Sequence, residues 1–150
     1  MTCKSIVAPV TATLAKGDSV AEAVKALAAH GFATLPVVDA KGHFLGVFGV
    51  RQLLALLLPR AARLGEDDMP DLSFVSDTSE DIKARLKSFA KESVGKAMAP
   101  HRTVRAETAL VEAMLLLERG DGFLPVVDEA GKLAGILTAE AVVARLAEGL

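Results

Sequence analysis

Hydrophobic positions along the chain follow two spacings. Between residues 20 and 27, apolar residues recur at helical intervals, which predicts a helix with one buried face. Residues 35–38 and 44–48 are short, nearly continuous apolar runs, which predict strands buried on both faces. A second helical pattern covers 51–58. The pattern therefore predicts a helix, two strands and a helix, in that order.

The same order of segments returns about 90 residues later. Leu35–Asp39 recurs as Leu124–Asp128, and Ser19–Ala23 matches Ala109–Ala113. The glycines that follow each aspartate also recur, at Gly42 and Gly131 and at Gly46 and Gly135. Short extended segments near Thr13–Leu14 and Thr103–Val104 precede the two units. The chain is therefore predicted to contain one β-α-β-β-α unit twice.

Polar residues and glycines mark the expected ends of these elements. Serine, threonine and aspartate before a helix can cap its free N–H groups, and glycine commonly ends a helix. Aspartate first and glycine last is typical of a tight turn between strands. The predicted caps and turns are Asp18–Ser19, Gly31, Thr108, Gly120, Asp39–Gly42 and Asp128–Gly131.

The segment between the two units has a different pattern. We divide the chain into a first repeat at 1–58, a connector at 59–93 and a second repeat at 94–150. Asp77 and Glu80 have capping-box spacing and predict a helix over about 78–92. Its apolar face carries Ile82, Leu86, Phe89 and Ala90, while Asp81 and Arg85 can pair on another face. Two interpretations stay open: a connector packed on its own core, or a helix that binds a partner.

Composition excludes several function classes. The net charge of -2 gives no basic surface for nucleic acid, and 4% aromatic residues cannot form stacking platforms for single strands. The apolar runs are too short to span a membrane, and the N-terminus does not resemble a signal peptide. Cys3 has no disulfide partner and lies near an end expected to be mobile. A cytoplasmic protein is expected.

No catalytic or metal-binding arrangement is visible in the sequence. His30, His43 and His101 lack a second histidine or cysteine at ligand spacing, so no metal is expected. Neither a glycine-rich phosphate loop nor a nucleophile with a neighbouring base occurs. The sequence therefore does not predict an enzyme.

The duplicated unit resembles a tandem pair of CBS domains, also called a Bateman module. The resemblance rests on Ser19–Ala23, Leu35–Asp39, Gly42, Gly46–Phe48, Val94, Met98, Pro100, Leu124–Asp128, Gly131 and Gly135–Thr138. It implies an α/β (α+β) fold in which two units with pseudo-twofold symmetry leave two clefts between them. It also implies dimerisation and regulation through AMP, ADP, ATP or S-adenosylmethionine as ligand. With no attached domain, the chain is expected to act as a small stand-alone module on another protein.

The nucleotide-binding stretch of the family is incomplete in both repeats. Members that bind nucleotides carry Gly-apolar-apolar-Thr/Ser-x-x-Asp, in which the hydroxyl contacts phosphate and the carboxylate binds the ribose. In the first repeat, Gly49 replaces the hydroxyl residue and Gln52 replaces the aspartate. In the second repeat, Thr138 is kept, but Ala141 replaces the aspartate. The nearest carboxylate there is Glu140, one place out of register. The candidate ligand-binding residues are Thr138, Thr103, Arg51, Gln52, Arg102 and Gly49.

Each candidate also has a structural interpretation. Thr138 precedes the last helix and could simply cap it. Arg51 could be a solvated surface charge, Gln52 part of the first helical turn, and Thr103 an ordinary strand residue.

Two functions remain. The first is a sensor that binds an adenosine-containing metabolite between its repeats and modulates a partner protein. The second is a ligand-free scaffold that dimerises through its repeats and docks a partner through the connector helix. A homodimer is expected in both cases, because the closing helices at 53–58 and 141–144 carry more apolar surface than one core face needs.

Overall fold

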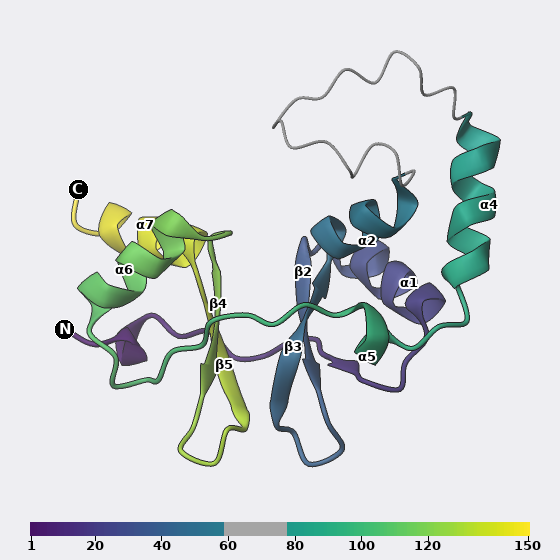
Figure 1. Ribbon diagram of the computed structural model, residues 1–150. Coiled ribbons are helices and arrows are strands. Elements are labelled where there is room, and N and C mark those ends of the chain that lie inside the picture. The colour runs from purple at the N-terminus through teal and green to yellow at the C-terminus, as the bar shows by residue number, and fades with distance from the viewer. Residues whose placement is uncertain (59–77) are drawn as a thin grey trace.

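The computed structural model describes residues 1–58 and 78–150 of the chain (Figure 1). Two β-hairpins stand side by side at its centre, each with a pair of helices at its outer side. The predicted α+β class with two similar units is confirmed. The elements are η1 (Cys3–Ser5), β1 (Leu14–Ala15), α1 (Val20–His30), β2 (Thr34–Val38), β3 (Phe44–Gly49), α2 (Val50–Leu57), α4 (Ser79–Phe89), α5 (Val94–Ala97), α6 (Leu110–Arg119), β4 (Phe123–Val127), β5 (Leu133–Thr138) and α7 (Ala139–Ala147).

The two hairpins share one register. Thr34 pairs with Gly49 in the first hairpin, and Phe123 pairs with Thr138 in the second. Both hairpins contain an irregularity at the last residue of the leading strand. β1 runs parallel to β2, whereas in the second repeat Val104 makes a single parallel bridge to β4. The internal repeat in the sequence is therefore a repeat of backbone geometry.

The predicted turns at the two hairpin tips are confirmed. In the first, Oδ1 of Asp39 accepts hydrogen bonds from the backbone N–H groups of Lys41 and His43, both at 2.9 Å. Gly42 follows with a φ of 86°, a conformation that L side chains rarely adopt. The N–H of His43, together with that of Lys41 and the His43 ring, holds the pKa of Asp39 below its usual value. Asp128 closes the second turn in the same way.

The two tips also bond to each other. The N–H of Phe44 donates to the carbonyl of Gly131, and the N–H of Leu133 donates to the carbonyl of Gly42, both at 3.0 Å. These reciprocal bonds relate the two hairpins by the pseudo-twofold symmetry that the resemblance implied.

The ends of α1 lie where the sequence predicted them, but the start of α6 does not. The hydroxyl of Ser19 accepts from the N–H of Glu22 at 3.1 Å, and Gly31 ends α1 in the left-handed conformation. The prediction that Thr108 caps α6 is wrong, because Ala109 is the N-cap residue and offers no side-chain bond. The Thr108 hydroxyl instead accepts from the N–H of Arg105 and closes the preceding turn.

The connector helix begins one residue later than its capping pattern predicted. Thr78 and Asp81 form the capping box: the Thr78 hydroxyl accepts from the N–H of Asp81 at 3.2 Å, and the carboxylate of Asp81 accepts from the N–H of Thr78 at 2.9 Å. The predicted box of Asp77 and Glu80 is therefore wrong, and Asp77 itself lies outside the described residues. The aligned N–H and hydroxyl of Thr78 lower the pKa of Asp81, with a smaller contribution from Arg85.

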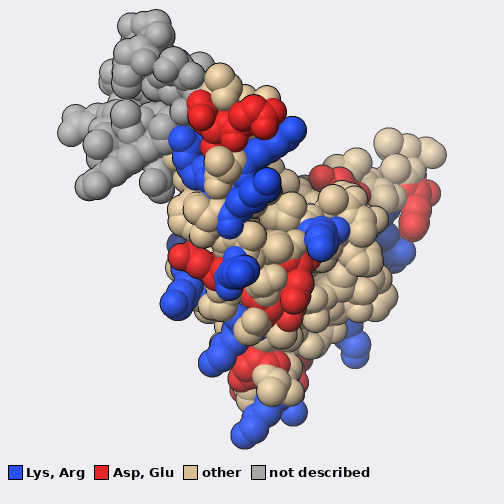
Figure 2. Space-filling view, turned by 90° about the vertical axis from the view of Figure 1, so that its right-hand side faces the viewer, with Lys and Arg blue, Asp and Glu red and all other residues tan. Residues whose placement is uncertain are grey.

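Helix α4 packs on the first repeat. It lies against α2, where the guanidinium of Arg85 donates to the carbonyl of Leu57. Leu86 packs against the core of the first repeat, whereas Ile82 near the helix start is 40% exposed. The apolar face of α4 is therefore used in part within the chain, as a connector packed on its own core requires. Figure 2 shows acidic and basic side chains interspersed on the face that carries this helix.

The N-terminal segment belongs in space to the second repeat. The N–H of Cys3 donates to the carbonyl of Thr108, and Ala8 and Ile136 exchange two backbone hydrogen bonds of 2.9 and 3.0 Å. Cys3 is fully buried, and burial raises the pKa of its thiol. The expectation that Cys3 lies near a mobile end is wrong, since η1 fills the core of the second repeat.

The start of the second sequence repeat, in turn, completes the first unit. Val94 is fully buried in the core of the first repeat, and the N–H of Gly95 donates to the carbonyl of Lys16. Ala99 and Val47 exchange two backbone hydrogen bonds of 2.9 Å. The two repeats therefore exchange their leading segments, and each core contains residues from both halves of the sequence (Figure 1).

This exchange requires glycine at the crossing points. A Cβ at Gly46 would lie 2.6 Å from the carbonyl oxygen of Ala99, and one at Gly135 would lie 2.3 Å from Cγ1 of Val7. Both distances are shorter than real Cβ contacts allow. The glycine repeated at these two positions is therefore explained by the chain that passes over each hairpin.

We expect Gly46→Ala to lower the free energy of unfolding by about 1–3 kcal/mol, because the added methyl group forces the backbone at Ala99 away from β3. Gly17→Ala is the matched control, since a Cβ there meets nothing within 4 Å, and it should change stability by less than about 0.5 kcal/mol. Urea unfolding followed by circular dichroism measures both. Equal effects of the two substitutions would contradict the steric explanation.

Candidate ligand-binding cleft

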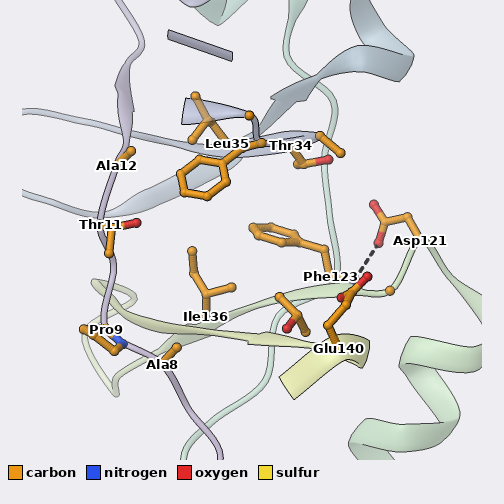
Figure 3. Close-up of a pocket in the computed structure, with 15 residues that line it drawn as sticks. Ala8, Pro9, Thr11, Ala12, Thr34, Leu35, Asp121, Phe123, Ile136 and Glu140 are labelled. Atoms are coloured by element: carbon orange, nitrogen blue, oxygen red, sulfur yellow. Dashed lines mark hydrogen bonds between the residues drawn. The ribbon is translucent and has the colours of Figure 1, made fainter. Parts of the chain in front are cut away.

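A cavity of about 540 Å³ opens between the two repeats. Three parts of the chain build its walls: the exchanged N-terminal segment, the loop between α1 and β2, and the second repeat around the edge of the β4–β5 hairpin (Figure 3). The lining residues are Ala8, Pro9, Thr11, Ala12, Gly31, Phe32, Ala33, Thr34, Leu35, Asp121, Gly122, Phe123, Ile136, Thr138 and Glu140. This volume suits a ligand of the size of a nucleoside.

The walls of the cavity are largely apolar. Each repeat contributes one aromatic ring, Phe32 from the first and Phe123 from the second. The Phe32 ring stacks on His30 with centroids 5.6 Å apart, and the Phe123 ring meets His101 edge-on at 5.8 Å. Figure 3 shows the side chains of Phe123 and Ile136 directed into the space between the repeats. Such surfaces can hold a flat heterocycle through stacking and apolar contact.

Thr138 lies at the polar edge of this cavity. Its hydroxyl oxygen accepts a hydrogen bond of 3.1 Å from the N–H of Ala141 and so caps α7. A hydroxyl that accepts from a backbone N–H still has its own proton to donate. The capping interpretation is therefore confirmed, and it leaves Thr138 able to donate to a ligand as well.

Two carboxylate side chains line the cavity, and they differ in how many hydrogen bonds they already make. Nε2 of His101 lies 3.0 Å from both oxygens of Asp121, and Oδ1 of Asp121 also accepts from the N–H of Phe123 at 3.2 Å. Nδ1 of His101 lies 2.8 Å from the carbonyl oxygen of Arg102, so the imidazole is held on both sides. Glu140 has no such partner in the described part of the chain. Asp121 is therefore fixed, whereas Glu140 is available.

No lysine or arginine is among the described residues that line the cavity. With Asp121 and Glu140 as its ionisable groups, this lining favours an uncharged or positively charged ligand surface. A phosphate group is accommodated better at the mouth of the cavity than against these carboxylates.

Of the six residues predicted from the sequence, Thr138 alone lines this cavity among the described residues. Arg51 is exposed at the start of α2, and Arg102 and Thr103 are exposed in the segment before Val104. The side-chain oxygen of Gln52 accepts from the N–H of Gly49 at 2.8 Å, which is the structural role foreseen for a residue in a first helical turn. That Arg51, Gln52, Arg102 and Thr103 contact a ligand stays a prediction.

The missing hydroxyl at Gly49 has a steric cause. A Cβ at this position would lie 2.3 Å from the carbonyl oxygen of Ala33 and 2.8 Å from Cα of Thr34. Gly49 and Thr138 occupy equivalent places in their hairpins. In the second repeat the corresponding loop turns through Gly122 with a φ of 75°, and the threonine is present. The two repeats therefore differ where a nucleotide-binding hydroxyl is expected.

Most residues that line the cavity were not predicted from the sequence. Phe32 and Asp121 follow α1 and α6, and Phe123 is the direct neighbour of Thr138 across the β4–β5 pair. Phe123 could have been found from the repeat. In each hairpin the first residue of the leading strand pairs with the last residue of the second strand, so Phe123 is expected opposite Thr138. The contribution of Thr11 had no such signal, since it depends on the exchanged segment.

The fold and the cleft define the class: a tandem pair of α/β repeats with a ligand-sized cavity at their junction. The chain belongs to the CBS domain family, whose profile matches residues 3–59 and 94–148, once in each repeat. The resemblance to a tandem CBS-domain pair is thereby confirmed.

Among characterised relatives, the chain is similar to the chloroplastic CBS domain-containing proteins CBSX2 and CBSX1 of Arabidopsis thaliana. Identity is 33% and 31%, in both cases over 123 residues that make up 80% of this chain and 52% of the relative. The chain thus spans about half the length of these curated relatives.

Solved structures show the same fold. CBSX2 in complex with AMP superposes with a TM-score of 0.72 at 27% identity, covering 98% of this chain and 96% of that one. A hypothetical conserved protein from Geobacillus kaustophilus shares the fold with a TM-score of 0.76 at 21% identity, covering 100% and 98% of the two chains.

Two kinds of feature are absent from residues 1–58 and 78–150. No group of three or more histidine, cysteine, aspartate or glutamate residues in these ranges is arranged to hold a metal ion. No helix in residues 1–58 or 78–150 is long and apolar enough to cross a membrane.

The two roles of Thr138 are separable. Thr138→Ala removes the cap of α7 and should lower the free energy of unfolding by about 1 kcal/mol, whereas Thr138→Ser keeps an accepting oxygen and should cost about half of that or less. Thermal and urea unfolding of the three proteins measure this difference. A serine variant as unstable as the alanine variant would show that the methyl group, and not the cap, stabilises this site.

Proposed function

We propose that this protein is a regulatory CBS-pair module that binds an adenosine-containing metabolite in the cleft between its repeats and so modulates a partner protein. The observation that carries the proposal is that both repeats, together with the exchanged N-terminal segment, wall one cavity of nucleoside size. A ligand there contacts both halves at once, and binding can therefore favour one relative placement of the halves over another. The relative CBSX2, which has been solved in complex with AMP, supports this class of ligand.

The lining indicates how such a ligand would be arranged. The adenine ring fits between the apolar walls that carry Phe32 and Phe123, and the sugar then faces the polar edge at Thr138. AMP, ADP, ATP and S-adenosylmethionine share the base and sugar, and they differ in the charge that they would place beside the carboxylates of Asp121 and Glu140.

A thermal-shift panel tests the proposal. We expect at least one of adenosine, AMP, ADP, ATP, S-adenosylmethionine, NAD and a cyclic dinucleotide to raise the melting temperature, because a ligand that binds only the folded state stabilises it. The shift should be smaller with ATP than with adenosine or S-adenosylmethionine, since its phosphates meet two carboxylates and no lysine or arginine among the lining residues described.

Two variants locate the binding site. Phe123→Ala removes an aromatic wall of the cavity and should reduce the ligand-induced shift, measured against the variant's own melting temperature without ligand. Arg51→Ala is the control, because Arg51 does not line this cavity. A flat response to the whole panel, or a shift that Arg51→Ala abolishes and Phe123→Ala leaves unchanged, would count against this cleft.

The alternative function, a ligand-free scaffold that docks a partner through α4, is less well supported. This helix packs on α2, and Leu86 contacts the first repeat's core, so part of the face proposed for docking is already in use. Ile82 alone among the apolar residues of that face is exposed. Two expectations stay predictions: that the module regulates a partner protein, and that it is located in the cytoplasm.

We also propose that the module is a homodimer formed through its helices. Large apolar side chains are exposed on the neighbouring helices α6 and α7, with Val111 78%, Leu115 47%, Val143 65% and Leu146 60% exposed. Exposed apolar side chains gathered on adjacent elements are typical of protein–protein interfaces. A second copy of the chain with the same surface would cover them.

Light scattering after size exclusion at tens of micromolar should give the mass of a dimer. Val143→Asp should shift the mass toward the monomer, because it places a charge in the apolar contact. Lys41→Asp is the control, since Lys41 lies in an exposed turn at the tip of the first hairpin, away from α6 and α7 (Figure 1). A monomeric wild type, or a dimer that Val143→Asp leaves intact, would refute this interface.

A further inference from the structure

We propose that Glu140 is the carboxylate that binds the sugar hydroxyls of the ligand in this cleft. The inference rests on the proposed function, because it assigns a residue of the same site. The family pattern places an aspartate at the position of Ala141, and this chain has none there. The structure offers a carboxylate one residue earlier, on a side chain that is longer by one methylene group.

Glu140 has the position that this role needs. It lies in the first turn of α7, two residues after Thr138, and both residues line the cavity. Figure 3 shows the Glu140 side chain beside the cavity, close to Phe123 and Asp121. Because the hydroxyl of Thr138 is fixed by its bond to the N–H of Ala141, the start of this helix has a defined geometry. A sugar held at Thr138 therefore lies within reach of Glu140.

Glu140 is also the carboxylate with free acceptor capacity. Asp121 already bonds to Nε2 of His101 through both oxygens and to the N–H of Phe123 through one of them. In the described part of the chain Glu140 has no hydrogen-bond or ion-pair partner. A free carboxylate can accept one hydrogen bond on each oxygen, which matches the two neighbouring hydroxyls of a ribose.

Ala141 has no carboxylate to bind a sugar, and its environment is consistent with a small apolar side chain at this position. Its side chain packs against the core of the second repeat, and its N–H is used by Thr138. The polar function at the start of α7 has thus moved to residue 140, which faces the cavity. A purely structural role for Glu140, the attraction between a carboxylate and the N-terminus of a helix, would affect stability and not ligand selectivity.

The test compares ligands that differ in the hydroxyls alone. Isothermal titration measures the affinities of adenosine and 2′,3′-dideoxyadenosine, and of AMP and 2′,3′-dideoxy-AMP, for the wild type and for Glu140→Gln. In the wild type, removal of the hydroxyls should weaken binding by roughly tenfold or more, because hydrogen bonds to a charged group are lost. In Glu140→Gln, the ratio between each ligand and its dideoxy counterpart should fall to about a third or less of the wild-type value.

Glu112→Gln is the matched control. Glu112 also lies in the first turn of a helix, α6, but does not line the cavity, so the wild-type ratio should be preserved. If Glu140→Gln retains the full discrimination against the dideoxy ligands, another group binds the hydroxyls and the assignment is wrong, while the proposed function stands. If the folded wild type binds none of the adenosine-containing compounds of the panel, the proposed function fails, and the assignment fails with it.

Discussion

The structure depends on two places where backbone passes over backbone. The N-terminal segment pairs with β5 at Ile136, and the start of the second sequence repeat pairs with β3 at Val47. Each crossing fits because Gly46 and Gly135 have no side chain to obstruct it. The two crossings make the cores interdependent, since Val94 fills one and Cys3 fills the other. They also place residues 8–12 between the hairpins, where these residues become one wall of the cavity.

The cavity is asymmetric although the fold that contains it is repeated. At the end of β5, Thr138 combines a helix cap with a hydroxyl at the cavity wall, and at the equivalent place in β3 the backbone of Ala33 excludes any side chain. One aromatic ring, Phe32, comes from the loop after α1 and the other, Phe123, from the start of β4, and the carboxylates come from the second repeat alone. Duplication thus supplied the framework, and substitutions at a few loop and helix-start positions made one junction suited to a small polar ligand with a flat apolar part.

Sequence patterns predicted the elements well because local rules govern them. Helical spacing, the Ser19 cap and the aspartate–glycine turns depend on residues close in the chain, and all three are confirmed. The two capping errors have different causes: at Asp77 the neighbouring Thr78 caps the helix instead, whereas the Thr108 hydroxyl closes the preceding turn and leaves Ala109 as the N-cap.

Predictions about tertiary arrangement were weaker for a physical reason. The apolar character of Val94, Cys3 and Ile6 indicates burial, but no local pattern specifies which repeat will bury them. The candidate site was predicted from the strand–helix junctions of both repeats, and only Thr138 lies in the cavity among those six residues. The aromatic walls that were missed are Phe32, in the loop after α1, and Phe123, at the start of β4, and their convergence follows from how the two hairpins meet.

The exchange of leading segments also constrains the order in which the chain can fold during synthesis. The N-terminal segment leaves the ribosome well before Ile136, the residue with which it pairs. The first repeat likewise lacks Val94 and Ala99 until the connector has been made. Pairings between such distant positions carry a large loop-closure entropy and form slowly. Neither core is therefore complete until residues from both repeats are present, and Cys3 becomes buried only when the second repeat folds around it.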